Sequence, residues 1–263
     1  MSERVLRRSE PSFLQRHPFP MRAHFDEVLA VSFAFPKDVL KPLLPAGLEL
    51  DTFEQLGFVT VALVWTRGLR IVGFPRWLGR DFFLCGYRIF ARLREPGGRR
   101  LRGLKILRSE TDRASMVRLG NLITGYRYRL IRAARTEAGG MTRVQTFLPN
   151  DQGTPQLDLR FEASETTAEL PPGSPFRGWR QARQFAGPMP FTFSPQGDGS
   201  FVVIEGARTH WTPRPVRIHD WQVGLFAEEP FRETQPILAN AFQVSNVDYR
   251  WKRGRIVRPN ISP

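Results

Sequence analysis

The feature of this sequence that most limits its fold is a series of short apolar runs, rich in valine, isoleucine and aromatic residues, that end at glycine or proline. Runs of this length and composition are typical of β-strands. The pairs Gly97-Gly98 and Gly139-Gly140 each lie between two such runs and predict hairpins. Because no regular alternation of strands with long helices is visible, we expect a mainly β (β-rich α+β) fold, either a sandwich or a closed barrel.

A few short helices are expected at the periphery. Residues 36–45 have a proline at each end, and residues 110–123 contain Thr111 or Asp112 as a capping residue and a glycine near their end. A third short helix is expected near residues 176–184. Strands therefore dominate the expected fold.

The chain is expected to form one domain. Its start is polar and interrupted by proline, which predicts a loosely ordered arm over residues 1–23. No long linker divides the remainder, so residues 24–263 are expected to form a single domain. The N-terminus shows no apolar signal-peptide core, and the longest apolar run, Phe58–Trp65, is far shorter than the about 20 residues that span a bilayer. We therefore expect a cytoplasmic protein without a membrane segment.

The composition is strongly basic. Thirty-five arginines and four lysines oppose 25 acidic residues, which gives a formal charge of +14. Such a charge favours anionic ligands or partners, although the arginines are spread along the chain rather than gathered in one block. Residues 126–129 (YRYR) and 251–258 (WKRGRIVR) mix cations with aromatic residues, but no glycine-aromatic RNA-binding motif accompanies them. A binder of nucleic acid or of an acidic partner is therefore only a secondary alternative.

The sequence argues against metal and nucleotide cofactors. The four histidines, His17, His24, His210 and His219, include no pair spaced four residues apart and adjoin no cluster of carboxylates. No glycine-rich loop stands between a strand and a helix. The single cysteine, Cys85, alternates along an expected strand and is interpreted as a buried structural thiol. We therefore expect no cofactor and no metal.

Lys105 is the most conspicuous candidate nucleophile, because it interrupts an apolar run between Leu104 and Ile106. A lysine removed from water can lose its proton near neutral pH and attack a carbonyl group. On a strand, however, Lys105 faces away from both apolar neighbours. We interpret it as a surface lysine and keep it, with Tyr128 and Glu110, as a weak catalytic candidate.

Two segments carry a resemblance to a known family. Residues 33–68, which include LLPAGLELD, and residues 103–130 resemble the YqjF-like family of uncharacterised bacterial proteins, also called domain of unknown function 2071. The similarity is good over residues 25–165 and looser in the C-terminal third. This family is similar to acetoacetate decarboxylase, which implies a cone-shaped closed β-barrel with a few short peripheral helices. The decarboxylase relatives also tend to form homo-oligomers, so the resemblance implies a homo-oligomer here.

The resemblance also implies a change in chemistry. Acetoacetate decarboxylases carry a segment Gly-Arg-Glu-x-x-Gly-aromatic-Pro-Lys-Lys, in which the first lysine forms a Schiff base and the second lowers its pKa. On residues 120–129 the glycines and the aromatic residue match, but the Schiff-base lysine falls on Tyr128 and its neighbour on Arg129. The other departures from the family segment fall on Asn121, Leu122 and Arg127. A phenol cannot form an imine, so decarboxylase activity of this type is not expected.

Strand alternation supports an internal pocket in place of the lost lysine site. Tyr126 and Tyr128 share one face of an expected strand, and Arg88 lies on another strand where it could bind a carboxylate through two hydrogen bonds. We therefore expect a pocket formed by Tyr126, Tyr128, Arg88 and Asn121 for a small anionic or carbonyl-containing organic ligand.

The sequence leaves the function class open. The first alternative to a binding protein is an enzyme that acts on a keto acid or a related carbonyl compound through other cavity residues, with Tyr128, Lys105 and Glu110 as candidates. The second alternative is a protein that binds nucleic acid or an acidic partner.

Overall fold

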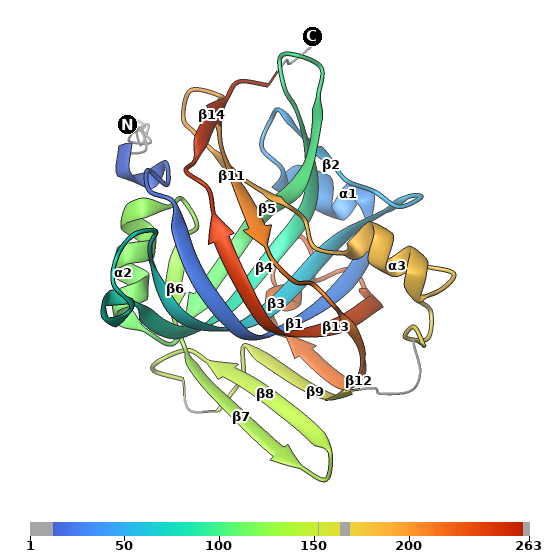
Figure 1. Ribbon diagram of the computed structural model, residues 1–263. Helices are drawn as coiled ribbons and strands as arrows, with labels where there is room; N and C mark the ends of the chain where they lie inside the picture. The colour runs from blue at the N-terminus through green and yellow to red at the C-terminus, as the bar shows by residue number, and fades with distance from the viewer. Residues whose placement is uncertain (1–12, 152, 164–168, 260–263) are drawn as a thin grey trace, which may run out of the picture.

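The computed structural model describes residues 13–151, 153–163 and 169–259, and strands dominate it (Figure 1). The longest strands form where apolar, β-branched and aromatic residues follow one another without a turn signal. These are β1 (Met21–Pro36), β3 (Leu56–Ile71), β4 (Arg80–Arg94), β5 (Arg100–Thr111) and β13 (Ile237–Trp251). Shorter strands complete the main sheet: β2 (Leu48–Leu50), β6 (Tyr128–Leu130), β10 (Phe191–Pro195), β11 (Phe201–Arg208) and β14 (Arg255–Val257).

Within the described residues the main sheet closes on itself. The strand order runs β11, β10, β5, β4, β3, β1, β13, and β13 pairs again with β11. Neighbours along this ring are antiparallel except β5 and β10, which run parallel. The mainly β fold and the closed arrangement of strands are therefore confirmed.

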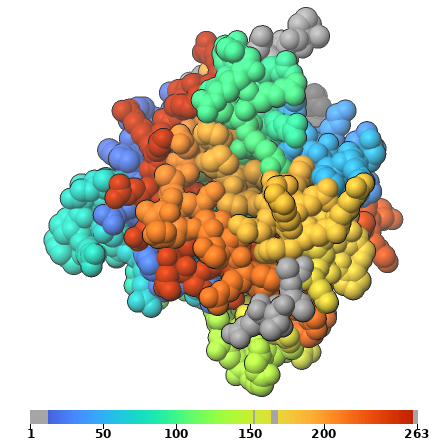
Figure 2. All heavy atoms as spheres, turned by 45° about the vertical axis from the view of Figure 1, so that its right-hand side comes forward, coloured from blue at the N-terminus to red at the C-terminus, as the bar shows by residue number. Residues whose placement is uncertain are grey.

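Other elements cover the ring from outside. Strands β7 (Arg132–Ala138), β8 (Met141–Phe147), β9 (Leu157–Ala163) and β12 (Arg214–Val223) form a layer below the ring in Figure 1. Figure 2 shows the yellow-green part of this layer, β7 to β9, projecting below the segment that contains α3. The α-helices are short and peripheral, as expected: α1 (Lys37–Leu40), α2 (Ala114–Ile123) and α3 (Trp179–Ala186). The 3-10 helices are η1 (Phe13–Gln15), η2 (Lys41–Leu43), η3 (Arg76–Leu78) and η4 (Gly224–Ala227).

Two boundaries differ from the sequence prediction. The helix expected over residues 110–123 begins only at Ala114, because the backbone of the preceding residues still pairs within β5. Asp112 does not cap this helix; its Oδ1 accepts a hydrogen bond from the Phe83 N–H at 2.9 Å. The arm expected over residues 1–23 overlaps β1, which begins at Met21, and residues 1–12 lie outside the described part of the chain.

The strands β1, β3 and β4 are buried on both faces. On the outer face, side chains such as Leu63 and Cys85 pack against the β8–β9–β12 layer, and Cys85 is buried as expected. On the inner face, side chains such as Ala62 and Val64 point into the ring. The near-continuous apolar sequence of these strands follows from this double burial.

A register shift in the β4–β5 pairing decides which side chains of β5 point inward. Leu107 has no partner at this β-bulge. Ile106 lines the interior before the bulge and Ser109 lines it afterwards. Glu110 therefore points to the outer core, where it is fully buried. No helix in the described residues has the length and apolar character required to cross a membrane.

A buried carboxylate ties β2 to the ring. Asp51 is completely buried, and its Oδ1 accepts a hydrogen bond from Arg92 Nε at 2.7 Å while its Oδ2 accepts one from Arg102 Nε.

We predict that Asp51→Asn lowers the free energy of unfolding by about 3 kcal/mol, because two arginines lose their counter-charge. Urea denaturation measures this. Glu49→Gln, which removes only an exposed 3.9 Å ion pair with Arg94, should change stability little; equal effects of the two variants would contradict the assignment.

The buried Glu110 predicts a pH dependence of stability. Burial raises its pKa, although Arg108, Arg129 and Tyr87 oppose the shift. The folded chain therefore binds this proton more tightly than the unfolded chain, so the contribution is fully present below the unfolded pKa and is lost as pH rises towards the folded pKa. We predict that Glu110→Gln gains stability relative to the parent chain as pH rises from about 4 to 7. A pH-independent difference in urea midpoints would refute this.

Candidate functional site

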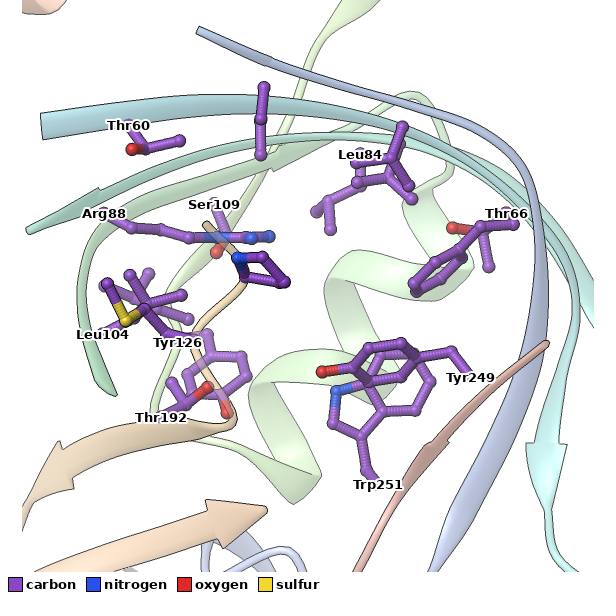
Figure 3. Close-up of a pocket in the computed structure, with 18 of the residues that line it drawn as sticks. Thr60, Thr66, Leu84, Arg88, Leu104, Ser109, Tyr126, Thr192, Tyr249 and Trp251 are labelled. Carbon is purple, nitrogen blue, oxygen red and sulfur yellow. The ribbon is translucent and has the colours of Figure 1, made fainter. Parts of the chain in front are cut away.

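The interior of the ring contains a cavity of about 170 Å³ (Figure 3). Its wall is mainly apolar and comes from β1, β3, β4, β5, β13 and α2. The volume is of the same order as engineered apolar cavities of roughly 150 Å³ that hold benzene. Among the described lining residues no aspartate, glutamate or lysine occurs, whereas the arginines Arg88 and Arg208 do. The cavity is therefore apolar, of small-molecule size and electrically positive.

Arg88 extends from β4 across the cavity wall. Gly86 makes this possible, because a Cβ at that position would lie 3.1 Å from Arg88 Nε. The two residues are two apart on one strand and share the inner face. No carboxylate in the described ranges pairs with Arg88, and Figure 3 shows its guanidinium reaching into the cavity above Tyr126. The strand thus presents to the cavity a guanidinium whose hydrogen-bond donors no described side chain engages.

Two predicted residues, Tyr126 and Tyr128, line the same cavity. Their ring centroids are 6.3 Å apart. Burial raises the pKa of Tyr128 to about 12, and Arg88 opposes this shift. Burial also raises the pKa of Tyr126, whose hydroxyl hydrogen-bonds Thr192. Both phenols are therefore neutral at physiological pH and can donate a hydrogen bond.

The position of Tyr128 depends on its neighbours in α2. A Cβ on Gly120 would lie 2.4 Å from Tyr128 Cδ2, so only glycine allows the ring to approach the helix this closely. Asn121 fixes the backbone of the same residue: its Oδ1 accepts from the Tyr128 N–H at 2.6 Å, and its Nδ2 donates to the Tyr128 carbonyl at 3.0 Å. Asn121 is not among the lining residues, so it positions the tyrosine instead of facing the cavity.

The other two sequence candidates lie outside the cavity. Lys105 faces away from its neighbours Leu104 and Ile106, which do line it, and its Nζ donates to the Ile106 carbonyl at 2.6 Å. Burial, with a smaller effect of Arg127, lowers its pKa to about 8. Glu110 lies in the outer core, where Tyr87 Oη donates to its Oε2 at 3.4 Å. Neither group is brought together with Tyr128 in the cavity.

Several lining residues were missed by the sequence prediction. Tyr249 and Arg208 come from β13 and β11, more than 75 residues after Tyr128, and only closure of the ring brings them to the same cavity. His17 also lines the cavity, and it is buried with a left-handed backbone (φ 54°). Alternation along β13 could have placed Tyr249 on a buried face, but no sequence signal indicated which one. In the described residues no three potential metal-ligating side chains cluster.

Comparisons with known proteins agree with this fold. The model of a family of uncharacterised conserved proteins, DUF2071, matches residues 22–245. Among curated proteins no match is found. An acetoacetate decarboxylase from Legionella pneumophila subsp. pneumophila str. Philadelphia 1 is similar in structure, with a TM-score of 0.60 and 12% identity over 93% of this chain and 90% of that chain.

Two further solved structures share the fold. The enduracididine biosynthesis enzyme MppR, complexed with pyruvate, has a TM-score of 0.59 and 12% identity over 91% of this chain and 90% of that chain. An acetoacetate decarboxylase-like enzyme from Sphingomonas wittichii RW1 has a TM-score of 0.56 and 13% identity over 95% of this chain and 96% of that chain. Together with the family match, these structures show that the chain belongs to the DUF2071 family of uncharacterised conserved proteins and has an acetoacetate decarboxylase-like fold.

Proposed function

We propose that this protein binds a small organic carboxylate in the cavity of its ring, with Arg88 as the anion-binding residue. The observation that carries the proposal is a guanidinium without a carboxylate partner in the described residues, set in an apolar cavity beside neutral phenols. A planar guanidinium can bind a carboxylate through two parallel hydrogen bonds. The apolar walls would then hold the hydrocarbon part of the ligand.

The enzymatic alternative is carbonyl chemistry that does not use an imine. MppR and the decarboxylases show that this fold can house enzymes, but no described lining residue here is a lysine. His17 supports the alternative, because burial lowers its pKa and leaves a neutral imidazole that could accept a proton. Deuterium uptake beside the carbonyl of 2-oxobutanoate, followed by NMR and abolished by His17→Gln, would establish it. Assembly into a homo-oligomer and a cytoplasmic location remain predictions.

Substitution of Arg88 tests the anion-binding role. Arg88→Gln should weaken benzoate binding roughly 10- to 100-fold, because it removes a charge-assisted hydrogen-bond donor. Isothermal titration calorimetry measures the affinity. The matched control is Arg94→Gln on the same strand, whose guanidinium lies 3.9 Å from Glu49 at the surface. Equal affinities of the two variants would count against Arg88 as the anion-binding residue.

Borohydride trapping tests for lysine chemistry in the cavity. Borohydride reduction in the presence of pyruvate should trap no covalent adduct inside the cavity, because no described lining residue can form an imine. An adduct inside the cavity would be recognised by its loss when benzoate is added as a competitor. Mass spectrometry of the intact chain and of its peptides provides the measurement. Lys105→Met controls for slow labelling of this amine, whose pKa is lowered to about 8. An adduct on Lys105 that benzoate suppresses would show that the lysine reaches the cavity.

A further inference from the structure

A second arginine, Arg208, faces the same cavity from β11. Its Cζ lies 4.9 Å from the centroid of the Trp211 ring, and its Nη2 donates to the Pro188 carbonyl at 3.4 Å. No carboxylate of residues 13–151, 153–163 or 169–259 forms an ion pair with it. Burial lowers the pKa of Arg208. The side chain is therefore held in place by an aromatic ring and one carbonyl while its charge lacks a partner there.

Tyr249 lines the cavity together with both arginines. Burial raises the pKa of its hydroxyl, and the charges of Arg208 and Arg88 oppose this shift. Gly206 leaves room for this hydroxyl, since a Cβ there would lie 1.8 Å from Tyr249 Oη. Figure 3 shows Tyr249 across the cavity from Arg88. Arg88 on β4 and Arg208 on β11 therefore line one cavity from different strands.

Nothing described in the wall neutralises these two charges. Burial is the largest influence on Tyr249 and raises its pKa, so this phenol stays protonated, as Tyr126 and Tyr128 do. No acidic residue occurs among the described lining residues. A cation in apolar surroundings is costly unless an anion pairs with it. Two cations that share one small apolar cavity therefore fit a ligand with two anionic groups.

We propose that the ligand is a small dicarboxylate, with one carboxylate bound by Arg88 and the other by Arg208, and with its hydrocarbon frame against the apolar wall. This inference rests on the proposed function, which requires only the carboxylate at Arg88. It adds a second anion site and so narrows the ligand class from carboxylates to dicarboxylates. A monocarboxylate would bring one negative charge to two arginines, whereas a dicarboxylate brings one for each.

Isothermal titration calorimetry with matched ligand pairs tests this inference. The probes are succinate, glutarate and adipate, each compared with the monocarboxylate of the same carbon number. The parent chain should bind at least one dicarboxylate about tenfold or more tightly than its partner, because a second charge-assisted pair forms. Arg208→Gln should reduce this affinity ratio to about threefold or less. Arg208→Lys, which retains the charge, should keep part of the ratio and guards against a folding defect in the first variant.

A surface arginine provides the control for general charge effects. Arg258 is 79% exposed, lies 3.5 Å from Asp198 and does not line the cavity. Arg258→Gln should therefore retain the affinity ratio of the parent chain. Equal binding of mono- and dicarboxylates by the parent chain would overturn the dicarboxylate inference and leave the proposed function standing. An equal loss of the affinity ratio in Arg208→Gln and Arg258→Gln would also overturn it. If the parent chain bound neither ligand class, the proposed function would fall as well.

Discussion

The burial of both faces of β1, β3 and β4 is the constraint on which the rest of the structure depends. One face needs an outer layer, which the β8–β9–β12 strands and η4 provide by packing on it. The other face becomes the wall of an interior that the ring closes and α2 and α3 flank. Because each strand alternates its side chains between these two environments, the identity of every second residue determines the chemistry of the cavity. A one-residue shift, such as the bulge at Leu107, moves a side chain from one environment to the other.

The cavity contains the positive charges of Arg88 and Arg208, and no described lining residue carries a negative charge. Glycines make its geometry possible at two points: Gly86 lets Arg88 lie along the wall, and Gly120 lets Tyr128 approach α2. The phenols stay neutral because burial raises their pKa, so they can orient a ligand without neutralising the arginine. In a decarboxylase of this fold the resemblance implies that a lysine stands where Tyr128 stands here. On that resemblance an amine is replaced by a phenol, which can donate a hydrogen bond but cannot form an imine; this agrees with the proposed role in ligand binding.

Sequence reasoning predicted the parts of this structure that local patterns determine. The mainly β fold followed from the strand patterns, and the family resemblance supplied the type of fold. Tyr126 and Tyr128 both line the cavity, but not by alternation along one strand, because β6 begins only at Tyr128 and Arg127 has a left-handed backbone (φ 53°). Sequence reasoning placed Asn121 in the pocket wrongly, because spacing does not reveal that a side-chain amide bonds the Tyr128 backbone. The outward direction of Lys105 followed from alternation, whereas that of Glu110 depends on the bulge in β5, which leaves no clear mark in the sequence. Arg208 and Tyr249 join the cavity only through ring closure, a long-range pairing that local patterns do not encode.

The central claim is that Arg88 binds the carboxylate of a ligand inside the ring, and NMR of the arginine Nε–H groups tests it most directly. The Arg88 signal is assigned by its loss in Arg88→Lys, and a carboxylate such as glutarate is then titrated into ¹⁵N-labelled protein. The account predicts a large, saturable shift of the Arg88 signal, with little change for exposed arginines such as Arg258. Small, unsaturated shifts spread evenly over all arginines would contradict it, because they would indicate only a general attraction between a basic surface and an anion.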